Sequence, residues 1–312
     1  MGLGSLIYKF YYKPTLKFRY NLTHFGVKGW YQLSTGEANM KREALKLRNY
    51  LSNYSKDNIQ LNFLTGKNYW HQTIFCIESF IQHYGNNFSV NIYSDGTIND
   101  EIESLFKNYC KEIEIVSNEK IETKLQRIIP IKDFPYLNQV RAWHPFFRRL
   151  IDIHINPGWN LHLDSDMLFF KYPSALIEAF ERKQAIFMFE QLDDSYFVDS
   201  VVVLKEKFDI DTIEKVNGGI IAYNGDQVNY IDLEEKLKVI LQNYKTAIPA
   251  EVEQTLMSHI LFNQYAKPLS KDEYNIFYGK DINSGLKTVS HYIFKAKKPY
   301  FSQEWKRVLE NL

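Results

Sequence analysis

The sequence predicts an α/β protein with a mostly parallel central sheet, flanked by helices and preceded by a basic, aromatic extension. Between residues 57 and 116, short apolar runs typical of strands alternate with longer runs of helical period. This order favours a parallel sheet with right-handed crossovers. A later strand-like run, 160–163, ends in two carboxylates, and open α/β sheets bind ligands at the carboxyl ends of their strands.

The composition is that of a soluble globular protein, because 45% of the 312 residues are hydrophobic and 24% are charged. Cys76 and Cys110 are too few for a disulfide framework and are typical of a reducing compartment, so we expect a cytoplasmic protein. No apolar run reaches the ~18 residues of a membrane span. The first residues also lack the pattern of a signal peptide.

Residues 1–56 form the first of two predicted segments. Residues 1–50 contain nine Lys or Arg against two Glu, although the whole chain has a net charge of only +1. Basic and aromatic residues alternate in 1–35, which suits peripheral contact with an anionic membrane. The alternative is an arm packed on the core through its rings. We expect no nucleic-acid partner, because the rest of the chain is acidic. Residues 36–56 have the pattern of a polar helix.

Residues 57–312 form the second predicted segment, which opens with alternating strands and helices. Gly66 is a lone glycine in the first turn, without the glycine-rich loops of dinucleotide-binding or P-loop enzymes, so both classes are disfavoured. The predicted elements are a strand at 60–65, a helix at 69–84, a strand at 88–93, a helix at 100–110 and a strand at 113–116.

Further elements follow in the second half of the chain. A predicted helix over 139–151 carries Arg148 and Arg149 near its end. They either form ion pairs on the surface or bind a diphosphate, because the planar guanidinium group suits phosphate oxygens. Paired glycines, Gly218 and Gly219, permit a close approach of backbone or ligand, or a bulge. The remaining predicted elements are a helix at 172–182, strands at 185–190 and 215–224, and a helix from Glu251, preceded by Pro249 and Ala250.

The stretch that contains Asp164, Ser165 and Asp166 carries the strongest chemical signal. A strand's period of two points both carboxylates to one side and Ser165 away. Paired carboxylates repel each other unless a cation neutralises them, and their oxygens suit Mn²⁺ or Mg²⁺. The alternative is a solvated turn. Apolar residues on both sides favour a metal–diphosphate site instead.

In their order and spacing these motifs resemble the GT-A nucleotide-sugar glycosyltransferases, over roughly residues 60–301. They are most similar to the retaining family that includes glycogenin and bacterial lipopolysaccharide galactosyl- and glucosyltransferases. The family's aromatic-x-Arg-Leu, metal and Asn-x-Gly motifs are matched by 147–150, 163–166 and 217–219. Where the family has an Asp-Gln pair, this chain has the similar Glu253-Gln254. Where the family has a late His followed by Lys-Pro-Trp, this chain has His291 followed by Lys-Pro-Tyr at 298–300, and the interval between the two motifs is one residue longer than in the family.

The resemblance implies metal-dependent transfer of a sugar, with retention, from a nucleotide-diphosphate sugar to a glycan or glycolipid acceptor. A UDP-sugar is the expected donor. The implied metal ligands are Asp164, Asp166 and His291, and the implied catalytic residues are Glu253 and Gln254. For His291 the alternative is a hydrogen-bonded core histidine, and for Glu253 an acid that favours the helix dipole. The implied donor contacts are Thr65, Gly66, Tyr69, Asp95, Arg149, Ser165, Asn217, Gly218, Gly219 and Lys298.

Three alternative functions remain open at this point. A haloacid-dehalogenase-like phosphatase also uses Asp-x-Asp after a strand, but near the start of its domain and followed by Gly-Thr rather than by Met167-Leu168. A non-catalytic membrane-bound scaffold would keep the fold without turnover. An inverting GT-A transferase would need a carboxylate base. Its candidates are Glu190, Asp193, Asp194, Glu251 and Glu253.

Overall fold

The computed structural model describes residues 13–52, 58–192, 196–279, 285 and 287–311. Three predictions therefore lie wholly or partly outside the described residues. They are the segment boundary at 56/57, the first part of the basic arm, and the candidate bases Asp193 and Asp194.

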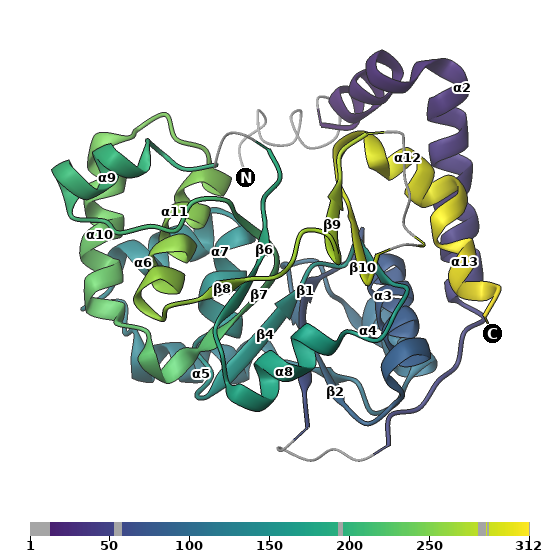
Figure 1. The fold of residues 1–312 in the computed structure, drawn as a ribbon, viewed down its shortest axis with the longest axis horizontal. Coiled ribbons are helices and arrows are strands. Elements are labelled where there is room, and N and C mark those ends of the chain that lie inside the picture. The colour runs from purple at the N-terminus through teal and green to yellow at the C-terminus, as the bar shows by residue number, and fades with distance from the viewer. Residues whose placement is uncertain (1–12, 53–57, 193–195, 280–284, 286, 312) are drawn as a thin grey trace.

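A seven-stranded sheet forms the centre of the molecule, in the order β3-β2-β1-β4-β7-β6-β8 (Figure 1). The pairs β3–β2, β2–β1, β1–β4 and β6–β8 are parallel, whereas β7 is antiparallel to both β4 and β6. The predicted mostly parallel α/β architecture is thus confirmed. The strands are β1 (Gln60–Thr65), β2 (Ser89–Ser94), β3 (Glu114–Ile115), β4 (Trp159–Leu163), β6 (Ile186–Phe189), β7 (Val216–Asn224) and β8 (Lys267–Pro268).

Helices cover both faces of this sheet. In β7 the neighbouring residues Ile220 and Ile221 are fully buried in two different apolar clusters, because successive side chains of a strand point to opposite faces. The flanking helices are α3 (Trp70–Tyr84), α4 (Asp100–Tyr109), α5 (Asn118–Ile128), α6 (Pro135–Trp143), α8 (Ser174–Arg182), α9 (Val201–Phe208), α10 (Tyr230–Asn243) and α11 (Pro249–Asn263).

A second sheet of three strands brings a late part of the chain to the end of β4. It has the order β5-β10-β9, with β5 (Met167–Phe169), β10 (Val289–Tyr292) and β9 (Tyr274–Phe277). β5 and β10 are antiparallel, and His291 pairs with Met167. This pairing was not predicted, and it carries His291 to the Asp-x-Asp stretch.

The prediction of a single helix over 139–151 is wrong, because the helical conformation is interrupted within this range. α6 ends at Trp143, and a new helical segment begins with α7 (Phe146–Arg148) and continues as the π-helical turn η2 (Arg149–Ile153). The cause is Pro145, which has no N–H to donate and disfavours helical backbone at the residue before it. His144 accordingly has an extended backbone.

The polar helix predicted at 36–56 is also corrected. The structure has one helix, α2 (Lys13–Ala44), interrupted by non-helical backbone at Gly26 (φ 66°, ψ 177°), and this helix ends before residue 45. Leu33 and Met40 in its second half are buried in the core. α2 lies beside the C-terminal elements α12 (Lys297–Pro299), η6 (Tyr300–Glu304) and α13 (Lys306–Leu309) (Figure 1).

Gly36 shows how closely α2 approaches these elements. A Cβ at this position would lie 2.1 Å from the Phe301 carbonyl oxygen. Part of the basic, aromatic extension therefore packs against the rest of the chain. No helix in the part of the chain that the structure describes is both long enough and apolar enough to cross a membrane.

Candidate active site

The two carboxylates and His291 meet at the carboxyl end of β4. One ligand atom from each of Asp164, Asp166 and His291 lies within 4.8 Å of the others. The Asp164 amide donates to the Gly219 carbonyl (2.8 Å), which ties the stretch to β7. Ser165 is buried, and its hydroxyl lies 2.9 Å from that of Thr73. The carboxylates and the serine therefore point in the directions that the strand period predicts.

Neighbouring cations offset the repulsion between the two carboxylates. Burial raises the pKa of Asp166, but the charges of Lys297 and His291 outweigh this effect and lower it. Burial likewise raises the pKa of Asp164, and a hydrogen bond from His162 together with the charge of Arg149 lowers it. Both carboxylates are therefore kept ionised, each with its own positive neighbours.

The donor atoms of this cluster fit a divalent metal. His291 Nε2 lies 3.1 Å from Asp166 Oδ1 and 3.8 Å from Asp164 Oδ2, so the ring nitrogen faces both carboxylates. Two carboxylates and one imidazole nitrogen are ligands that Mn²⁺ accepts, and Mg²⁺ takes the carboxylates. This geometry favours the ligand interpretation of His291 over that of a core histidine.

Arg149 and Glu253 form a buried ion pair behind the cluster. Arg149 Nε and Nη2 donate to the two Glu253 oxygens (3.0 and 2.7 Å), and Nη1 donates to the Gly218 carbonyl (3.0 Å). Nη1 also lies 3.5 Å from Asp164 Oδ1. Burial raises the pKa of Glu253 against the opposing charge of Arg149. The guanidinium thus links α11, β7 and the Asp-x-Asp stretch.

A cavity of about 260 Å³ opens in front of these groups. Nine of the predicted site residues line it, together with Glu190, which the sequence suggested only as a base for inversion. The Glu190 carboxylate accepts hydrogen bonds from Asn217 Nδ2 (2.8 Å) and from the amides of Gln191 and Leu192. The predicted residues that line the cavity are Arg149, Asp164, Asp166, Asn217, Gly218, Gly219, Glu253, Gln254 and His291.

The paired glycines make room for two of the site's side chains. A Cβ at Gly218 would lie 2.6 Å from Arg149 Nη1, and one at Gly219 would lie 2.6 Å from His291 Nδ1. The close approach expected at these positions is therefore made by the neighbouring side chains Arg149 and His291. Gln254 donates to the Val216 carbonyl at the start of the same strand.

Four of the predicted donor contacts lie around the end of β1. Thr65 Oγ1 accepts a hydrogen bond from Thr73 (2.8 Å), whose hydroxyl also meets Ser165. A Cβ at Gly66 would lie 2.1 Å from Asp95 Oδ1. Partial burial and then the charges of Asp166 and Asp95 raise the pKa of Tyr69. Thr65 and Tyr69 thus lie near the Asp-x-Asp stretch, and Gly66 and Asp95 lie beside each other at the end of β1.

Lys298 is not brought to the cluster, whereas its neighbour Lys297 is. Lys298 lines a separate groove with residues of α2. Lys297 Nζ contacts Asp166 and lies 3.2 Å from Gln72 Oε1. The sequence contained a signal for this residue, because the interval from His291 to Lys298 exceeds that of the resembling family by one.

Neither protein-family models nor curated protein sequences yield a match to this chain. Among solved structures, the bifunctional glycosyltransferase WbbM superposes with a TM-score of 0.51 at 10% identity, over 85% of this chain and 53% of WbbM. This chain has the GT-A glycosyltransferase fold. It spans about half the length of WbbM.

Two further solved structures align at lower scores. Mouse xyloside xylosyltransferase 1 aligns at a TM-score of 0.48 and 12% identity, over 75% of this chain and 97% of that one. The galactosyltransferase LgtC, in complex with donor and acceptor sugar analogues, aligns at 0.43 and 12% identity, over 81% and 95%.

Proposed function

We propose that this protein is a metal-dependent glycosyltransferase that moves a sugar from a nucleotide-diphosphate sugar, with UDP-sugar as the expected donor, to a glycan or glycolipid. The observation that carries the proposal is the Asp164–Asp166–His291 cluster beside a cavity at the end of β4, within a glycosyltransferase fold. A glycolipid acceptor would also account for the predicted contact of residues 1–35 with an anionic membrane.

Some residues of the site would act on the leaving diphosphate, and others would bind the sugar. Asp164, Asp166 and His291 would hold Mn²⁺ or Mg²⁺, which as a Lewis acid stabilises a departing diphosphate. Lys297 places an ammonium beside Asp166, where negative charge would develop during bond cleavage. Asn217 and Glu190 line the cavity as one hydrogen-bonded pair, suited to the hydroxyls of a sugar.

Retention is the proposed stereochemical outcome. It requires a group beneath the sugar, on the side away from the diphosphate, and Glu253-Gln254 are the proposed residues. Both line the cavity, but the two Glu253 oxygens already face Arg149. Gln254 is therefore the better candidate for direct contact. Proton NMR of the first-formed product tests this. An α-linked donor should give an α-linked product, and a β-linked product would move the catalytic role to a carboxylate base such as Glu190.

The transfer activity itself is tested by a thermal-shift screen of nucleotide sugars with and without Mn²⁺, followed by transfer assays. We expect stabilisation by one nucleotide sugar that depends on the metal, because the donor diphosphate and the metal bind together. Hydrolysis of a simple phosphate ester without any donor sugar would instead favour a phosphatase. Absence of both metal and nucleotide binding in calorimetry would favour a non-catalytic scaffold.

Lys297 and Lys298 provide a matched pair for testing the diphosphate contact. Lys297→Ala should lower kcat/KM for a soluble acceptor by roughly 10²-fold, the effect of losing one charge-stabilising donor. Lys298→Ala should lower it much less, because Lys298 lines a different groove. Steady-state kinetics at saturating Mn²⁺ decides the matter. A larger loss for Lys298→Ala would restore the assignment made from the sequence.

A further inference from the structure

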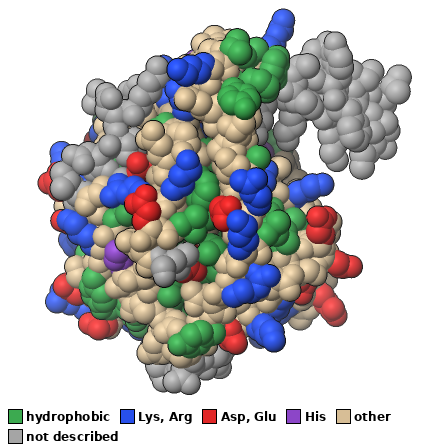
Figure 2. Space-filling model, turned by 90° about the vertical axis from the view of Figure 1, so that its right-hand side faces the viewer, with side chains coloured by type: hydrophobic (Ala, Val, Ile, Leu, Met, Phe, Trp, Pro, Cys, Tyr) green, Lys and Arg blue, Asp and Glu red, His purple; other side chains and the backbone are tan. Residues whose placement is uncertain are grey.

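The chain has a basic face beside the candidate active site, formed by α2 and the C-terminal helices. The described side chains of α2, residues 18–44, include four Lys or Arg and two Glu, and residues 297–309 contain four Lys or Arg and one Glu. Figure 2 shows this side of the molecule, where many Lys and Arg side chains lie among apolar side chains and a smaller number of Asp and Glu side chains. Lys297 contacts Asp166, and the next residue, Lys298, belongs to this face, so the face adjoins the site.

A polar groove of about 570 Å³ lies on this face, between α2 and the C-terminal helices. Its lining includes two lysines, two hydroxyls and three amides, and no carboxylate among the described residues. Neither Lys298 nor Lys306 has a carboxylate within ion-pair distance in the described part of the chain. Such a lining can donate hydrogen bonds and positive charge to phosphate oxygens. The lining residues are Gln32, Thr35, Gly36, Asn39, Lys298, Pro299, Ser302, Gln303 and Lys306.

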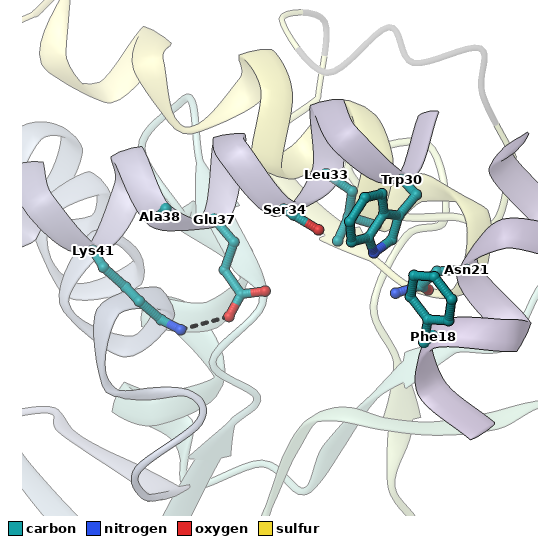
Figure 3. A pocket seen from close by; sticks show the side chains of 8 residues that line it. All are labelled: Phe18, Asn21, Trp30, Leu33, Ser34, Glu37, Ala38 and Lys41. Atoms are coloured by element: carbon teal, nitrogen blue, oxygen red, sulfur yellow. Dashed lines mark hydrogen bonds and ion pairs between the residues drawn. The ribbon is translucent and has the colours of Figure 1, made fainter. Parts of the chain in front are cut away.

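Exposed rings stand on the same helix. Phe18, Tyr20 and Tyr31 are 45%, 44% and 63% exposed, whereas the largest fully buried side chains of the described residues are all Tyr or Phe. Gly26 interrupts α2, and the two halves of this helix run in different directions (Figure 1). Figure 3 shows Phe18 and Asn21 of the first half facing Trp30 of the second across a cavity of about 400 Å³. Phe18 meets Trp30 edge to face at 5.3 Å.

We propose that this face docks on the surface of an anionic membrane, with lipid phosphates in the groove and the exposed rings of α2 at the interface. Charge complementarity selects this partner, because basic side chains attract anionic lipids and aromatic rings favour the headgroup region. The inference deepens the membrane contact of the proposed function. It adds the C-terminal lysines Lys298 and Lys306 to a contact that the sequence placed in residues 1–35 alone.

Vesicle co-sedimentation of the full chain, without donor or metal, tests the proposal independently of catalysis. We expect binding to vesicles that contain phosphatidylglycerol, little binding to pure phosphatidylcholine, and release by high salt. The double variant Lys298→Gln/Lys306→Gln should weaken binding about 30-fold, since each surface lysine contributes about one factor of five. The control Lys238→Gln/Lys245→Gln removes the same charge from exposed positions in and after α10 and should bind like the wild type.

Separate experiments test the exposed rings and test whether the groove binds lipid phosphate, inorganic phosphate or nucleic acid. Tyr31→Ser should weaken vesicle binding while circular dichroism shows an unchanged helix content, because this ring is 63% exposed. Equal binding to neutral and anionic vesicles, or equal losses in both lysine pairs, would overturn the proposal. So would binding of inorganic phosphate in the groove without any vesicle binding, or a preference for duplex DNA over vesicles. Sugar transfer to a soluble acceptor, assayed on the wild type, reports on the proposed function alone.

Discussion

Asp166→Asn should reduce sugar transfer by about 10³-fold or more, since the variant would lose a carboxylate that we propose as a ligand of the Lewis-acid metal. It should also weaken Mn²⁺ binding, which isothermal titration calorimetry measures without any donor. The substitution keeps the shape of the side chain, so the fold should persist. Asp164→Asn should behave in the same way, because both carboxylates belong to one cluster.

Asp272→Asn is the matched control, because Asp272 is exposed and lies outside the cavity. It should leave transfer and Mn²⁺ affinity unchanged. Undiminished turnover in either cluster variant would refute the assignment. Removing a single carboxylate should relieve repulsion, but Asp166 has Lys297 and His291 as neighbours. Asp166→Asn should therefore not stabilise the metal-free protein.

Glu253→Ala should lower the free energy of unfolding by about 3–5 kcal/mol, because the buried Arg149 guanidinium loses its two hydrogen bonds to a carboxylate and keeps only the more distant Asp164. Urea denaturation followed by circular dichroism measures the change. Glu251→Ala is the matched control on the same helix, two residues earlier. Its carboxylate only accepts a hydrogen bond from the Ile248 amide at the helix start, so a loss of about 1 kcal/mol is expected.

The double variant Arg149→Met/Glu253→Met separates stability from catalysis. Replacing both partners of a buried ion pair by apolar residues is often close to neutral, so much of the lost stability should return. Transfer should remain low, because Arg149 would no longer hold Gly218 and Asp164. Full recovery of transfer would show that the ion pair serves the fold alone. A stability of Glu253→Ala within about 1 kcal/mol of the wild type would show that Arg149 is solvated without it.

Local patterns in the sequence were sufficient for β1 to β4 and for the first two helices between them, α3 and α4. The strand predicted at 60–65 is β1, and the helix predicted at 69–84 is α3 within one residue. The helix predicted over 139–151 failed because periodicity was read across Pro145. Helices α5, α9 and α10 were not predicted. In α9 a short apolar run is extended by polar residues, and only the Ser200 cap marks its start.

The sequence by itself determined the mostly parallel α/β class of the main sheet and the pairing of Asp164 with Asp166. Both depend on the period of a single strand and on the alternation of neighbouring segments. Tertiary structure alone decided which distant residues complete the site. His291 reaches the carboxylates because β10 pairs with β5, and Lys297, not Lys298, reaches Asp166 because the chain turns into α12 at that residue. Such contacts depend on strand pairing and on helix direction across more than a hundred residues, which no local pattern encodes.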